Sequence, residues 1–389
     1  MKGGAELQAK ISPLRRESPQ PAHPLQFAVI GAGHGGQAIA GHLTLLGHRV
    51  RLFNRSPETI EGIRNAGGIS LDGVIRGMAR VERLTSDIGE ALAGTDVVMV
   101  AVPASAHEWV AEACAPHLRD GQVVVLNPGR TGGALEFRNV LRETGSQAEP
   151  IIAEAQTFIY ASRLISPGRS RIFRIKHSVP LAALPATSTE RVIRLLSSVL
   201  PQFIPAANVL KTSLDNIGAV FHPVITLLNG GWIESTAGNF EFYLDGVTPS
   251  VARMVEAVDR ERTSVARALR VRAMSALEFL EMAYGRHADN LYEAMKGNEA
   301  YKGIRAPRVL RHRYLFEDVP TGLVPMASLG EMLGVPTPNI NSLIQIASEL
   351  QGTNFWEIGR TVENLGLAGA TVEQIRHYVY HGGLVTWNG

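Results

Sequence analysis

Short β-rich segments that alternate with helical patterns constrain the fold of this chain more than any other feature. Four of them occur in the first third of the sequence, at residues 27–30, 49–53, 96–102 and 122–126. Residues 122–126 and the centre of residues 96–102 are largely apolar, without the alternation of a strand that has one face in water. Continuous apolar strands separated by helices are typical of a parallel sheet covered on both sides. We therefore expect an N-terminal α/β domain of the doubly wound class.

The sequence pattern changes near residue 209. Residues 151–154 and 171–184 still resemble strands of the first domain, whereas long helical patterns follow at residues 212–229, 250–269, 273–284 and 339–350. Prolines and glycines separate these helical patterns. The sequence therefore predicts a flexible tail (1–25), a sheet domain (26–208) and a mostly α-helical C-terminal domain (209–389). A ligand site is expected between the two domains.

Charge and cysteine content exclude several classes of protein. The 389 residues carry 38 basic and 36 acidic side chains, a formal net charge of +2, so nothing favours a nucleic acid or an anionic membrane as partner. Cys114 is the only cysteine, which excludes an intrachain disulfide and a cysteine-based metal site. We expect it to be buried on one face of a helix, and we predict no metal site.

Targeting and membrane signals are absent from the sequence. The first 25 residues contain four prolines but no apolar run of the kind that a secretion signal needs. No later segment offers the roughly 18 apolar residues that span a bilayer. We therefore expect a cytoplasmic protein.

A glycine loop directly follows the first apolar segment. Gly31, Gly33 and Gly36 fit the pattern G-x-G-x-x-G, with Ala32 between the first two, and a helix is predicted over residues 37–46. The first glycine permits a tight turn, the second lets the backbone approach a pyrophosphate, and the third allows close packing of helix on strand. The helix N-terminus would stabilise the negative charge. The alternative is a glycine-rich turn of an unrelated α/β fold, but the order of strand, loop and helix favours a Rossmann dinucleotide-binding domain.

The end of the second predicted strand bears on the choice of cofactor. An acidic residue there would bind the ribose 2′-hydroxyl of NAD, but this chain has Asn54, Arg55 and Ser56. A guanidinium and a hydroxyl bind a 2′-phosphate, which an acid would repel. We therefore expect NADP(H). NAD(H) is the alternative if Arg55 is simply solvated or stacks on adenine.

Two further strand ends point to the same crevice, because ligands of open α/β sheets bind beyond the carboxyl ends of the strands. Val102 and Pro103 end one strand, and Asn127 begins the loop after another. Backbone amides there would line the cofactor, and Asn127 could bond its ribose or carboxamide. Arg130, in the same loop, could reach a phosphate or a substrate carboxylate, or could lie at the surface.

Two segments of the helical half hold candidate acid–base residues. Pro223 should kink a helix next to His222, and Asn229, seven residues later, lies on roughly the same helix face. Asn229 is therefore a candidate for binding substrate. Residues 311–322 hold a basic cluster and two acids before the pattern breaks. A carboxylate near a histidine fixes its tautomer, but spacing leaves open whether His222 and Asp318 meet. The alternatives are a core histidine and an exposed turn.

Taken together, these motifs resemble the opine dehydrogenase family of the octopine/nopaline type, closest to the bacterial enzymes that act on pyruvate and neutral L-amino acids. The resemblance covers nearly everything after the tail. Besides the glycine loop it rests on residues 126–137 (LNPGRTGGALEF), 197–202 (SSVLPQ), 219–229 (AVFHPVITLLN), 244–251 (LDGVTPSV), 297–303 (GNEAYKG) and 316–325 (FEDVPTGLVP). The motifs that carry His222 and Asp318 are far more specific than the glycine loop.

The resemblance implies a catalytic pair, His222 and Asp318, and substrate-binding roles for Arg313 and Asn216. It implies that a 2-oxo acid and an amino acid condense to an imine, which hydride from the nicotinamide reduces. His222 would act as general acid–base, oriented by Asp318. The family also implies a homodimer through the helical half. Gly218, where relatives can carry a polar residue, departs from the family pattern, so we expect a different amino-acid pocket.

Two other functions stay open. A reductase of the glycerol-3-phosphate or ketopantoate type would share the two-domain plan and use a lysine on the interdomain helix. Lys211 lies at the start of that helix, but His222 fits its centre. A non-catalytic NADP(H) sensor would need only the first domain, and the catalytic-type motifs of the second domain argue against it.

Overall fold

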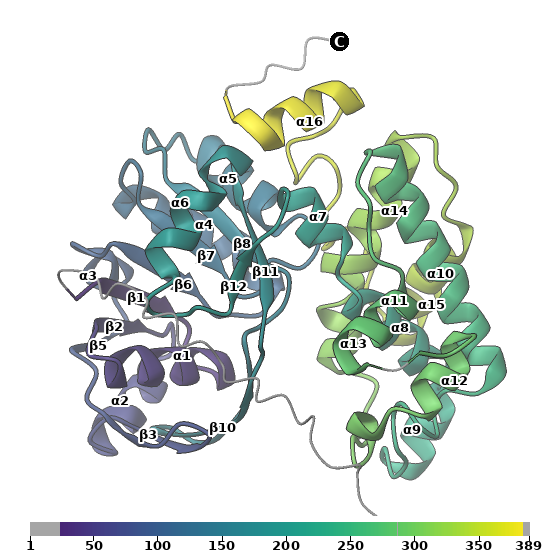
Figure 1. The fold of residues 1–389 in the computed structure, drawn as a ribbon, viewed down its shortest axis with the longest axis horizontal. Helices are drawn as coiled ribbons and strands as arrows, with labels where there is room; N and C mark the ends of the chain where they lie inside the picture. Colours follow the sequence, from purple (N-terminus) through teal and green to yellow (C-terminus); the bar gives the residue numbers. More distant parts are fainter. Residues whose placement is uncertain (1–23, 286, 384–389) are drawn as a thin grey trace, which may run out of the picture.

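The computed structural model describes residues 24–285 and 287–383. A sheet half occupies the left of Figure 1 and a helical half the right. The predicted fold class is confirmed, since a doubly wound N-terminal part is followed by a mostly α-helical one. The last strand ends at Pro205, and the next helix begins at Val209. All but two residues of the predicted tail lie outside the described residues.

The main sheet has eight strands in the order β12-β11-β8-β7-β6-β1-β2-β5. Neighbouring strands from β5 to β8 are all parallel, and the strand order reverses beside β1, as in doubly wound sheets. The strands are β1 (Gln26–Ile30), β2 (Arg49–Phe53), β5 (Arg83–Thr85), β6 (Val97–Val100), β7 (Val123–Leu126), β8 (Ile151–Ala155), β11 (Val179–Leu184) and β12 (Phe203–Pro205).

Helices cover both faces of this sheet. Val123 and Val125 of β7 belong to one hydrophobic cluster, and Val124 and Leu126 belong to another. This division explains why the strand is apolar without alternation. The helices of this half are α1 (His34–Leu45), α2 (Pro57–Asn65), α3 (Ile88–Leu92), η1 (Ala104–Ala106), α4 (His107–Cys114), η2 (Ala115–His117), α5 (Gly133–Glu143), η3 (Ala186–Ser188) and α6 (Thr189–Leu196).

The carboxyl ends of the parallel strands lie in one row. In the sheet register Ile30 pairs with both Phe53 and Val100, Val100 pairs with Leu126, and Leu126 pairs with Glu154. The loops that follow these strands therefore open at a single edge of the sheet. This is the edge at which open α/β sheets bind their ligands.

Two parts of the sheet half depart from a simple parallel sheet. β11 pairs antiparallel with β8, and a second sheet has the order β4-β3-β10-β9. Its strands are β3 (Ile69–Gly73), β4 (Gly77–Ala79), β9 (Tyr160–Ser166) and β10 (Arg169–Ile175). β9 and β10 largely alternate buried and exposed residues, as antiparallel strands with one face in water do. Residues 171–184 thus supply strands to two sheets.

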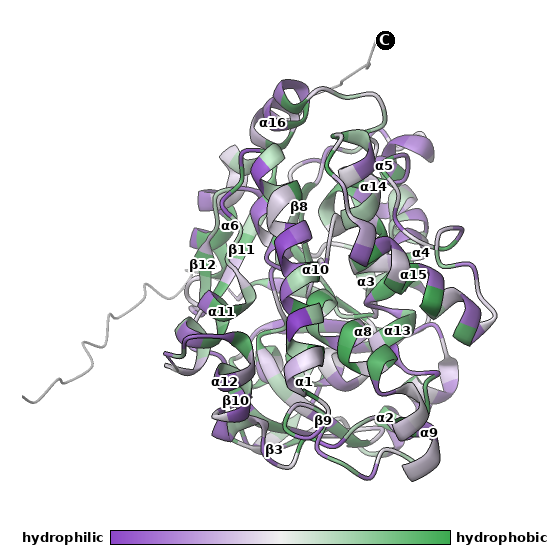
Figure 2. Cartoon of the chain, turned by 90° about the vertical axis from the view of Figure 1, so that its right-hand side faces the viewer, coloured by the Kyte–Doolittle hydropathy of each residue, from purple (hydrophilic) through white to green (hydrophobic). Residues whose placement is uncertain are grey.

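The helical half is built around α8 (Gly218–Leu228), most of whose residues are buried. Figure 2 draws α8 mostly green, whereas α10 alternates between purple and green. α10 therefore presents one face to the core and the other to solvent. The other helices are α7 (Val209–Leu214), α9 (Gly230–Thr236), α10 (Pro249–Ala268), α11 (Ala276–Tyr284), α12 (Leu291–Lys296), η4 (Glu299–Tyr301), α13 (Arg313–Phe316), η5 (Val319–Leu323), α14 (Val324–Met332), α15 (Pro338–Gln351) and α16 (Val372–His381).

The prediction of one helix over residues 212–229 is wrong, because α7 and α8 are separated by residues 215–217. The Asp215 carboxylate accepts the Met274 N–H, and the Asn216 amide donates to Thr131 Oγ1. Asp and Asn side chains that bond outside a helix compete with its backbone hydrogen bonds. The break brings the start of α8 to the loop after β7. Pro223 lies inside α8, which continues to Leu228.

The last helix returns to the sheet half. α16, yellow at the top of Figure 1, packs on β11 and η3. Its Ile375 and Val379 join the hydrophobic cluster that contains Val124 and Leu126 of β7. Part of the predicted helical domain therefore covers the sheet.

Arg360, between α15 and α16, is buried and fastens the helical half to two strand-end loops. It donates to the Glu136 carboxylate at 2.7 Å and to three backbone carbonyl oxygens, those of Ala104, Gly129 and Thr131. The two loops are those after β6 and β7. A single buried guanidinium thus fixes the loops that line the edge of the sheet.

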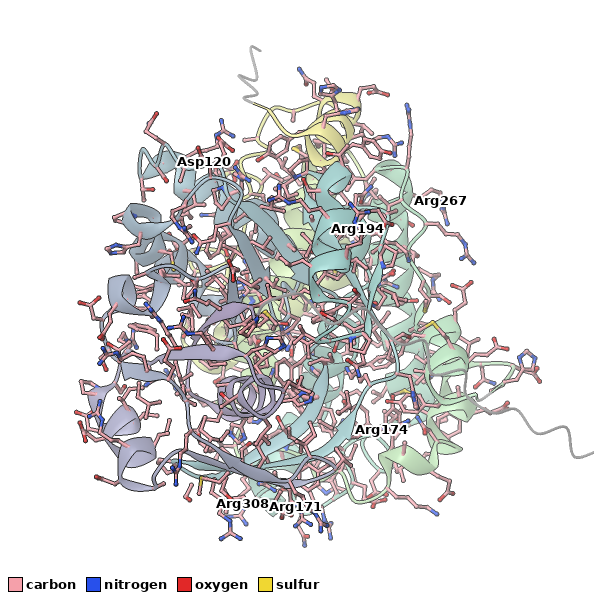
Figure 3. All side chains as sticks on the ribbon, turned by 60° about the vertical axis from the view of Figure 1, so that its left-hand side comes forward. Asp120, Arg171, Arg174, Arg194, Arg267 and Arg308 are labelled. Carbon is pink, nitrogen blue, oxygen red and sulfur yellow. The ribbon has the colours of Figure 1, made fainter. Side chains whose placement is uncertain are left out.

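The single cysteine lies in the sheet half, and charged side chains extend from the surface. Cys114 is buried in α4, as predicted. Figure 3 shows the labelled side chains of Asp120, Arg171 and Arg267 extending outward at different edges of the molecule. Within the described residues, no helix is both long and apolar enough to cross a membrane.

Candidate active site

The glycine loop lies between the ends of β1 and β6. Gly31 has φ +104°, and a Cβ on it would lie 2.8 Å from the Ala101 carbonyl oxygen. A Cβ on Gly36 would lie 1.7 Å from the Gly31 carbonyl oxygen, so only glycine permits this packing. A Cβ on Gly33, by contrast, would meet no atom within 4 Å. Gly33 therefore faces open space at the N-terminus of α1, as a loop that receives a pyrophosphate requires.

Asn54 holds the glycine loop in place. Its carboxamide oxygen accepts the Ala32 N–H at 3.0 Å, and its NH2 group donates to the Ser56 carbonyl oxygen at 3.3 Å. Ala32 and Asn54 were both predicted to bind the cofactor, yet they bind each other. Asn54 thus shapes the loop, and a direct contact of either residue with the cofactor stays a prediction.

Arg55 and Ser56 are exposed beyond the end of β2. The Arg55 guanidinium lies 5.4 Å from the centre of the Trp109 ring, which stacks on Phe53. Among the described residues, no carboxylate forms an ion pair with Arg55. Ser56 is the N-cap residue of α2, and its hydroxyl makes no capping bond. A cation, a hydroxyl and a helix N-terminus therefore meet where the sequence predicts a 2′-phosphate.

The ends of β6 and β7 border the same loop. Val102 Cγ1 lies 2.7 Å from the position of a Cβ on Gly31, and Pro103 precedes η1. The NH2 group of Asn127 donates to the Val125 carbonyl oxygen. Its buried Oδ1 has no hydrogen-bond partner in the part of the chain that the structure describes. Buried acceptors normally have a donor, so this oxygen fits the predicted bond to a cofactor.

His222 and Asp318 meet although 96 residues separate them. His222 Nδ1 lies 2.8 Å from Asp318 Oδ2, the carboxylate is fully buried, and the imidazole is 19% exposed. α8 supplies the histidine, and Asp318 is the N-cap residue of η5. Because a carboxylate only accepts hydrogen bonds, Nδ1 carries a proton in this pair. Nε2 of the neutral ring is therefore left as the proton acceptor.

Two tyrosines that the sequence analysis missed surround the imidazole. Tyr314 stacks on His222 with 4.1 Å between ring centroids, and Tyr243 Oη lies 3.1 Å from Nε2. Burial raises the pKa of Tyr243 well above its ordinary value. Its hydroxyl therefore keeps its proton and donates to Nε2. Nothing in the spacing of these tyrosines could have indicated the contact, because it depends on tertiary packing.

Arg130 joins this pair to the sheet half. Its Nη1 lies 3.2 Å from Asp318 Oδ1, an ion pair without hydrogen-bond alignment, and its Nε donates to Glu317 at 3.3 Å. Glu317 also accepts from the Ala104 N–H and from Arg313. Arg130 has φ +62°, a conformation that costs energy for any residue with a Cβ. The loop after β7 thus directs the guanidinium at two buried carboxylates.

Burial and charge act against each other in this cluster. Burial alone would raise the pKa of Asp318, but the charge of Arg130 and the hydrogen bond from His222 outweigh it, so the pKa of this carboxyl lies below its usual value. Burial would lower the pKa of Arg130, but Asp318 and Glu317 more than offset it, and the net pKa is raised. Both groups therefore stay ionised near neutral pH.

Asn216 and Gly218 lie at the start of α8, next to the pair. A Cβ on Gly218 would lie 3.1 Å from Arg130 Nη1, 3.4 Å from His222 Cε1 and 3.5 Å from Asn216 Oδ1. Any side chain at position 218 would therefore project among these three groups. Its absence leaves room beside the imidazole.

Arg313 lies at the exposed rim of the cluster. Its guanidinium makes two contacts with Glu317, at 2.9 and 2.8 Å, and its side chain is 59% exposed. It is therefore accessible to a carboxylate that enters from solvent.

Asn229, in contrast, is occupied elsewhere. Its NH2 group donates to the carbonyl oxygens of Ile225 and Gly246 at the end of α8. The last carbonyls of a helix lack partners within it, which explains the bond to Ile225. Within the described chain, no contact joins Asn229 to His222. The structure does not bring Asn229 to the other predicted site residues.

Sequence reasoning missed Glu317 and left Arg130 undecided. Glu317 stands next to Asp318 in the same specific motif, and Arg130 stands in the loop after β7, so chain position was the available signal. Among the described residues, no group of three or more His, Cys, Asp or Glu side chains could hold a metal ion.

Two family models match the chain. Residues 205–351 match the α-helical domain of NAD/NADP octopine/nopaline dehydrogenase. Residues 26–126 match the family model of coenzyme F420-dependent NADP oxidoreductases. A curated opine dehydrogenase of Arthrobacter sp. (strain 1C) is 42% identical over 354 residues, which cover 91% of this chain and 98% of the relative.

Solved structures share the fold over about nine tenths of the chain. Octopine dehydrogenase with NADH and L-arginine superposes with a TM-score of 0.76 at 22% sequence identity; the match covers 90% of this chain and 97% of the octopine dehydrogenase chain. Yersinopine dehydrogenase with NADP+ bound superposes with a TM-score of 0.71 at 16% identity, and the match covers 92% of this chain and 98% of the yersinopine dehydrogenase chain. These likenesses show the fold.

Proposed function

The chain belongs to the opine dehydrogenase family, and from this premise we propose that His222 and Asp318 carry out the acid–base steps of its reaction. Members of the family are NAD(P)-dependent oxidoreductases that act on CH–NH donors and couple a 2-oxo acid to the amino group of an amino acid. The observation that carries the proposal is the contact of His222 Nδ1 with the buried Asp318 carboxylate at 2.8 Å. It leaves Nε2 at the side of the ring away from Asp318, where a substrate proton can be accepted.

The proton steps follow from this geometry. His222 Nε2 accepts a proton from the ammonium group of the amino acid, the free amine attacks the carbonyl carbon of the 2-oxo acid, and a proton of the attacking nitrogen passes to the carbonyl oxygen to give the carbinolamine. His222 returns its proton to the carbinolamine hydroxyl, which leaves as water, so a protonated imine forms. Tyr243 Oη lies 3.1 Å from Nε2; its O–H turns away when Nε2 takes the substrate proton, and its oxygen then accepts a hydrogen bond from the protonated nitrogen between the two steps. Asp318 stabilises the imidazolium that forms.

The glycine loop and the neighbouring strand ends fit a nicotinamide dinucleotide. When bound, this cofactor supplies the hydride that reduces the imine to a secondary amine. Gly33 and the α1 N-terminus would hold the pyrophosphate, and the buried Asn127 Oδ1 would accept a hydrogen bond from ribose or carboxamide. We propose NADP(H) as the preferred form. The support is Arg55, which pairs with no carboxylate in the described chain, beside Ser56 at the start of α2.

Substrate binding is proposed for the space beside Gly218. Asn216 Oδ1 and His222 both face the position that a side chain at 218 would fill. Arg313, exposed at the rim, is suited to a carboxylate of the amino acid. Its contact with Glu317 would then orient the guanidinium between the enzyme and the substrate.

A ketopantoate-type reductase is less well supported. That reading needs a free lysine on the interdomain helix, but Lys211 of α7 is ion-paired with Asp215, whose other oxygen accepts the Met274 N–H. Lys211 is therefore already paired within the protein, whereas the side chain of His222 is 19% exposed and accessible to a substrate.

The test is the oxidation of NADPH with pyruvate and a panel of amino acids. Consumption that depends on both substrates supports the proposed reaction. Consumption with the oxo acid alone would indicate a ketone reductase, and binding of NADPH without consumption would indicate a sensor. A parallel series with NADH measures the cofactor preference.

Oligomeric state and location stay predictions from the family and the sequence. We propose a homodimer formed through the helical half, to be measured by sedimentation equilibrium of the full chain. We propose a cytoplasmic location, to be measured by cell fractionation.

A further inference from the structure

Lys176 is a cation that the acid–base mechanism does not use. It lies in the connection between β10 and β11, where the chain passes from the small sheet to the main sheet. Its side chain is half-buried, and Nζ donates to Thr157 Oγ1 at 2.7 Å. Within the described residues, the lysines that form ion pairs are Lys211 and Lys302, so no carboxylate pairs with Lys176.

The neighbours of Thr157 in sequence contact both the start of α1 and the break before α8. Gln156 Nε2 donates to the Asp215 carbonyl oxygen at 3.1 Å, at the break before α8. On the other side, the Phe158 ring lies 2.8 Å from the position of a Cβ on Gly35, in the first turn of α1. Thr157 therefore lies between the dinucleotide loop and the start of the helix that carries His222.

The charges near Lys176 leave it without an internal counterion. Burial, together with the positive charge of Arg130, lowers the pKa of Lys176 to about 8. The buried carboxylates nearest to Arg130 are already shared, since Glu317 binds Arg130 and Arg313, and Asp318 binds Arg130 and His222. A cation that is partly removed from water and lacks a counterion is stabilised by an anion that binds beside it.

We propose that the Lys176 ammonium, held by Thr157, binds the carboxylate of the 2-oxo acid. This inference rests on the proposed function. In the imine, the carboxylate of the oxo acid is attached directly to the carbon that receives hydride, whereas the carboxylate of the amino acid lies beyond the nitrogen and its α-carbon. The group beside the glycine loop therefore fits the first carboxylate. Arg313, on the helical half, fits the second.

The assignment gives the two substrate carboxylates separate anchors, Lys176 on the sheet half and Arg313 on the helical half. An oxo acid held by Lys176 would lie between the glycine loop, which would hold the cofactor, and the start of α8, the helix that carries His222. The lysine would thus determine that the acceptor is an acid and not a neutral ketone.

The experiment compares the full-length wild type with Lys176→Met, Lys176→Arg and Thr157→Val, with Lys302→Met as the matched control on an exposed lysine. Initial rates are measured while pyruvate and the amino acid are varied separately, and NADPH affinity is measured by fluorescence. We expect Lys176→Met to raise the KM for pyruvate by about 10- to 100-fold, the usual effect of losing a charged hydrogen bond. The amino-acid KM and the NADPH affinity should change less than about threefold, since neither contact involves Lys176.

Methyl pyruvate, which lacks the negative charge, gives a second readout. The wild type should prefer pyruvate strongly by kcat/KM, and Lys176→Met should lose most of this preference, while Lys176→Arg should keep part of it. Thr157→Val should show the same trend more weakly, and it keeps the proposal testable if Lys176→Met does not fold.

Three outcomes would overturn the inference in an active wild type: an unchanged pyruvate KM in Lys176→Met, a rise confined to the amino-acid KM, or a loss of kcat with both KM values unchanged. A wild type that consumes NADPH with no pair of substrates would instead refute the proposed function itself. The two failures are therefore distinguishable.

Discussion

Arg130 and Asp318 form a buried ion pair across the two halves of the molecule. Arg130 Nη1 lies 3.2 Å from Asp318 Oδ1, and the other oxygen of the same carboxylate holds His222 at 2.8 Å. One carboxylate thus connects the loop after β7 to the histidine on α8. The carboxylate that orients the histidine is therefore paired with a cation of the other half of the molecule.

The first prediction concerns Arg130→Met. Removing one partner of a buried pair leaves the other charge uncompensated and costs about 3–5 kcal/mol of stability. We expect the free energy of unfolding to fall accordingly and kcat to fall by at least tenfold, because Asp318 then becomes protonated more readily. Urea denaturation and initial rates measure both effects. Arg130→Lys should lose less, and Arg253→Met, at an exposed site, should lose neither. If Arg130→Met were as stable and as active as the wild type, the Arg130–Asp318 ion pair would contribute neither to stability nor to catalysis.

The second prediction concerns His222 and Tyr243. We expect His222→Ala to lower kcat by about 10²- to 10⁴-fold, the usual contribution of general acid–base catalysis, with NADPH affinity unchanged. Tyr243→Phe keeps the ring but removes the hydroxyl that bonds Nε2, so a smaller loss of kcat is expected. The measurements are steady-state rates and fluorescence titration with NADPH. Turnover close to wild type in His222→Ala would exclude the histidine as the acid–base group.

The third prediction concerns cofactor preference. Arg55→Ala should weaken NADPH binding by about tenfold or more and leave NADH binding nearly unchanged, because only NADPH carries the 2′-phosphate. The effect should shrink as ionic strength rises, since Arg55 is exposed. Titrations with both cofactors at low and high salt measure it. Arg253→Ala, on the helical half, is the control. Equal losses for NADPH and NADH would mean that Arg55 contacts the adenine instead.

The fourth prediction concerns Gly218. A side chain there would project within 3.1–3.5 Å of Arg130, His222 and Asn216. We expect Gly218→Leu to raise the amino-acid KM strongly without weakening NADPH binding. Gly218→Ala should have a milder effect on the KM, and a small loss of stability is expected because its Cβ would lie 3.1 Å from Arg130 Nη1. Gly231→Ala in α9, where a Cβ meets nothing within 4 Å, is the control. An unchanged KM in the leucine variant would place the substrate elsewhere.

The fifth prediction concerns acid stability through His42. Burial lowers the pKa of this histidine to about 4, from a reference value of 6.5. The unfolded chain therefore takes up a proton first as pH falls. The contribution to stability is complete above pH 6.5 and is lost between pH 6.5 and 4, at up to about 1.4 kcal/mol per pH unit. His42→Gln should flatten the dependence of unfolding free energy on pH in this range, whereas His177→Gln, at an exposed site, should not. If the unfolding free energies of His42→Gln and wild type changed with pH in the same way, His42 would not be a source of the acid sensitivity.

Most of the fold was predictable because its signals are local. The strand at residues 49–53 and the glycine loop were placed correctly from apolar runs and from the φ requirement at Gly31. The break at residues 215–217 was not predictable, since the bonds that stop the helix come from Met274 and Thr131, far along the chain. The antiparallel pairing of β11 with β8 likewise depends on the path of the intervening chain.

The candidate site likewise contains residues that sequence motifs identified and contacts that only the structure revealed. His222, Asp318 and Arg313 were identified through motifs that resemble a family, and the position of Asn54, Arg55 and Ser56 followed from the length of one strand–helix–strand unit. Asn229 shares a helix face with His222 by spacing, but its amide bonds Ile225 and Gly246. Helical periodicity predicts the face of a residue and not its partners, which are residues distant in sequence.

The sequence by itself therefore determined the doubly wound sheet, the dinucleotide loop and the family, because hydrophobic period and glycine geometry act over a few residues. Only the tertiary structure decided which polar groups meet: Arg130 with Asp318, Tyr243 with His222, and Lys176 with Thr157. These contacts join different elements of the fold, so helical or strand periodicity does not indicate them. Burial makes each of them stronger than it would be in water, because the surrounding dielectric constant is lower.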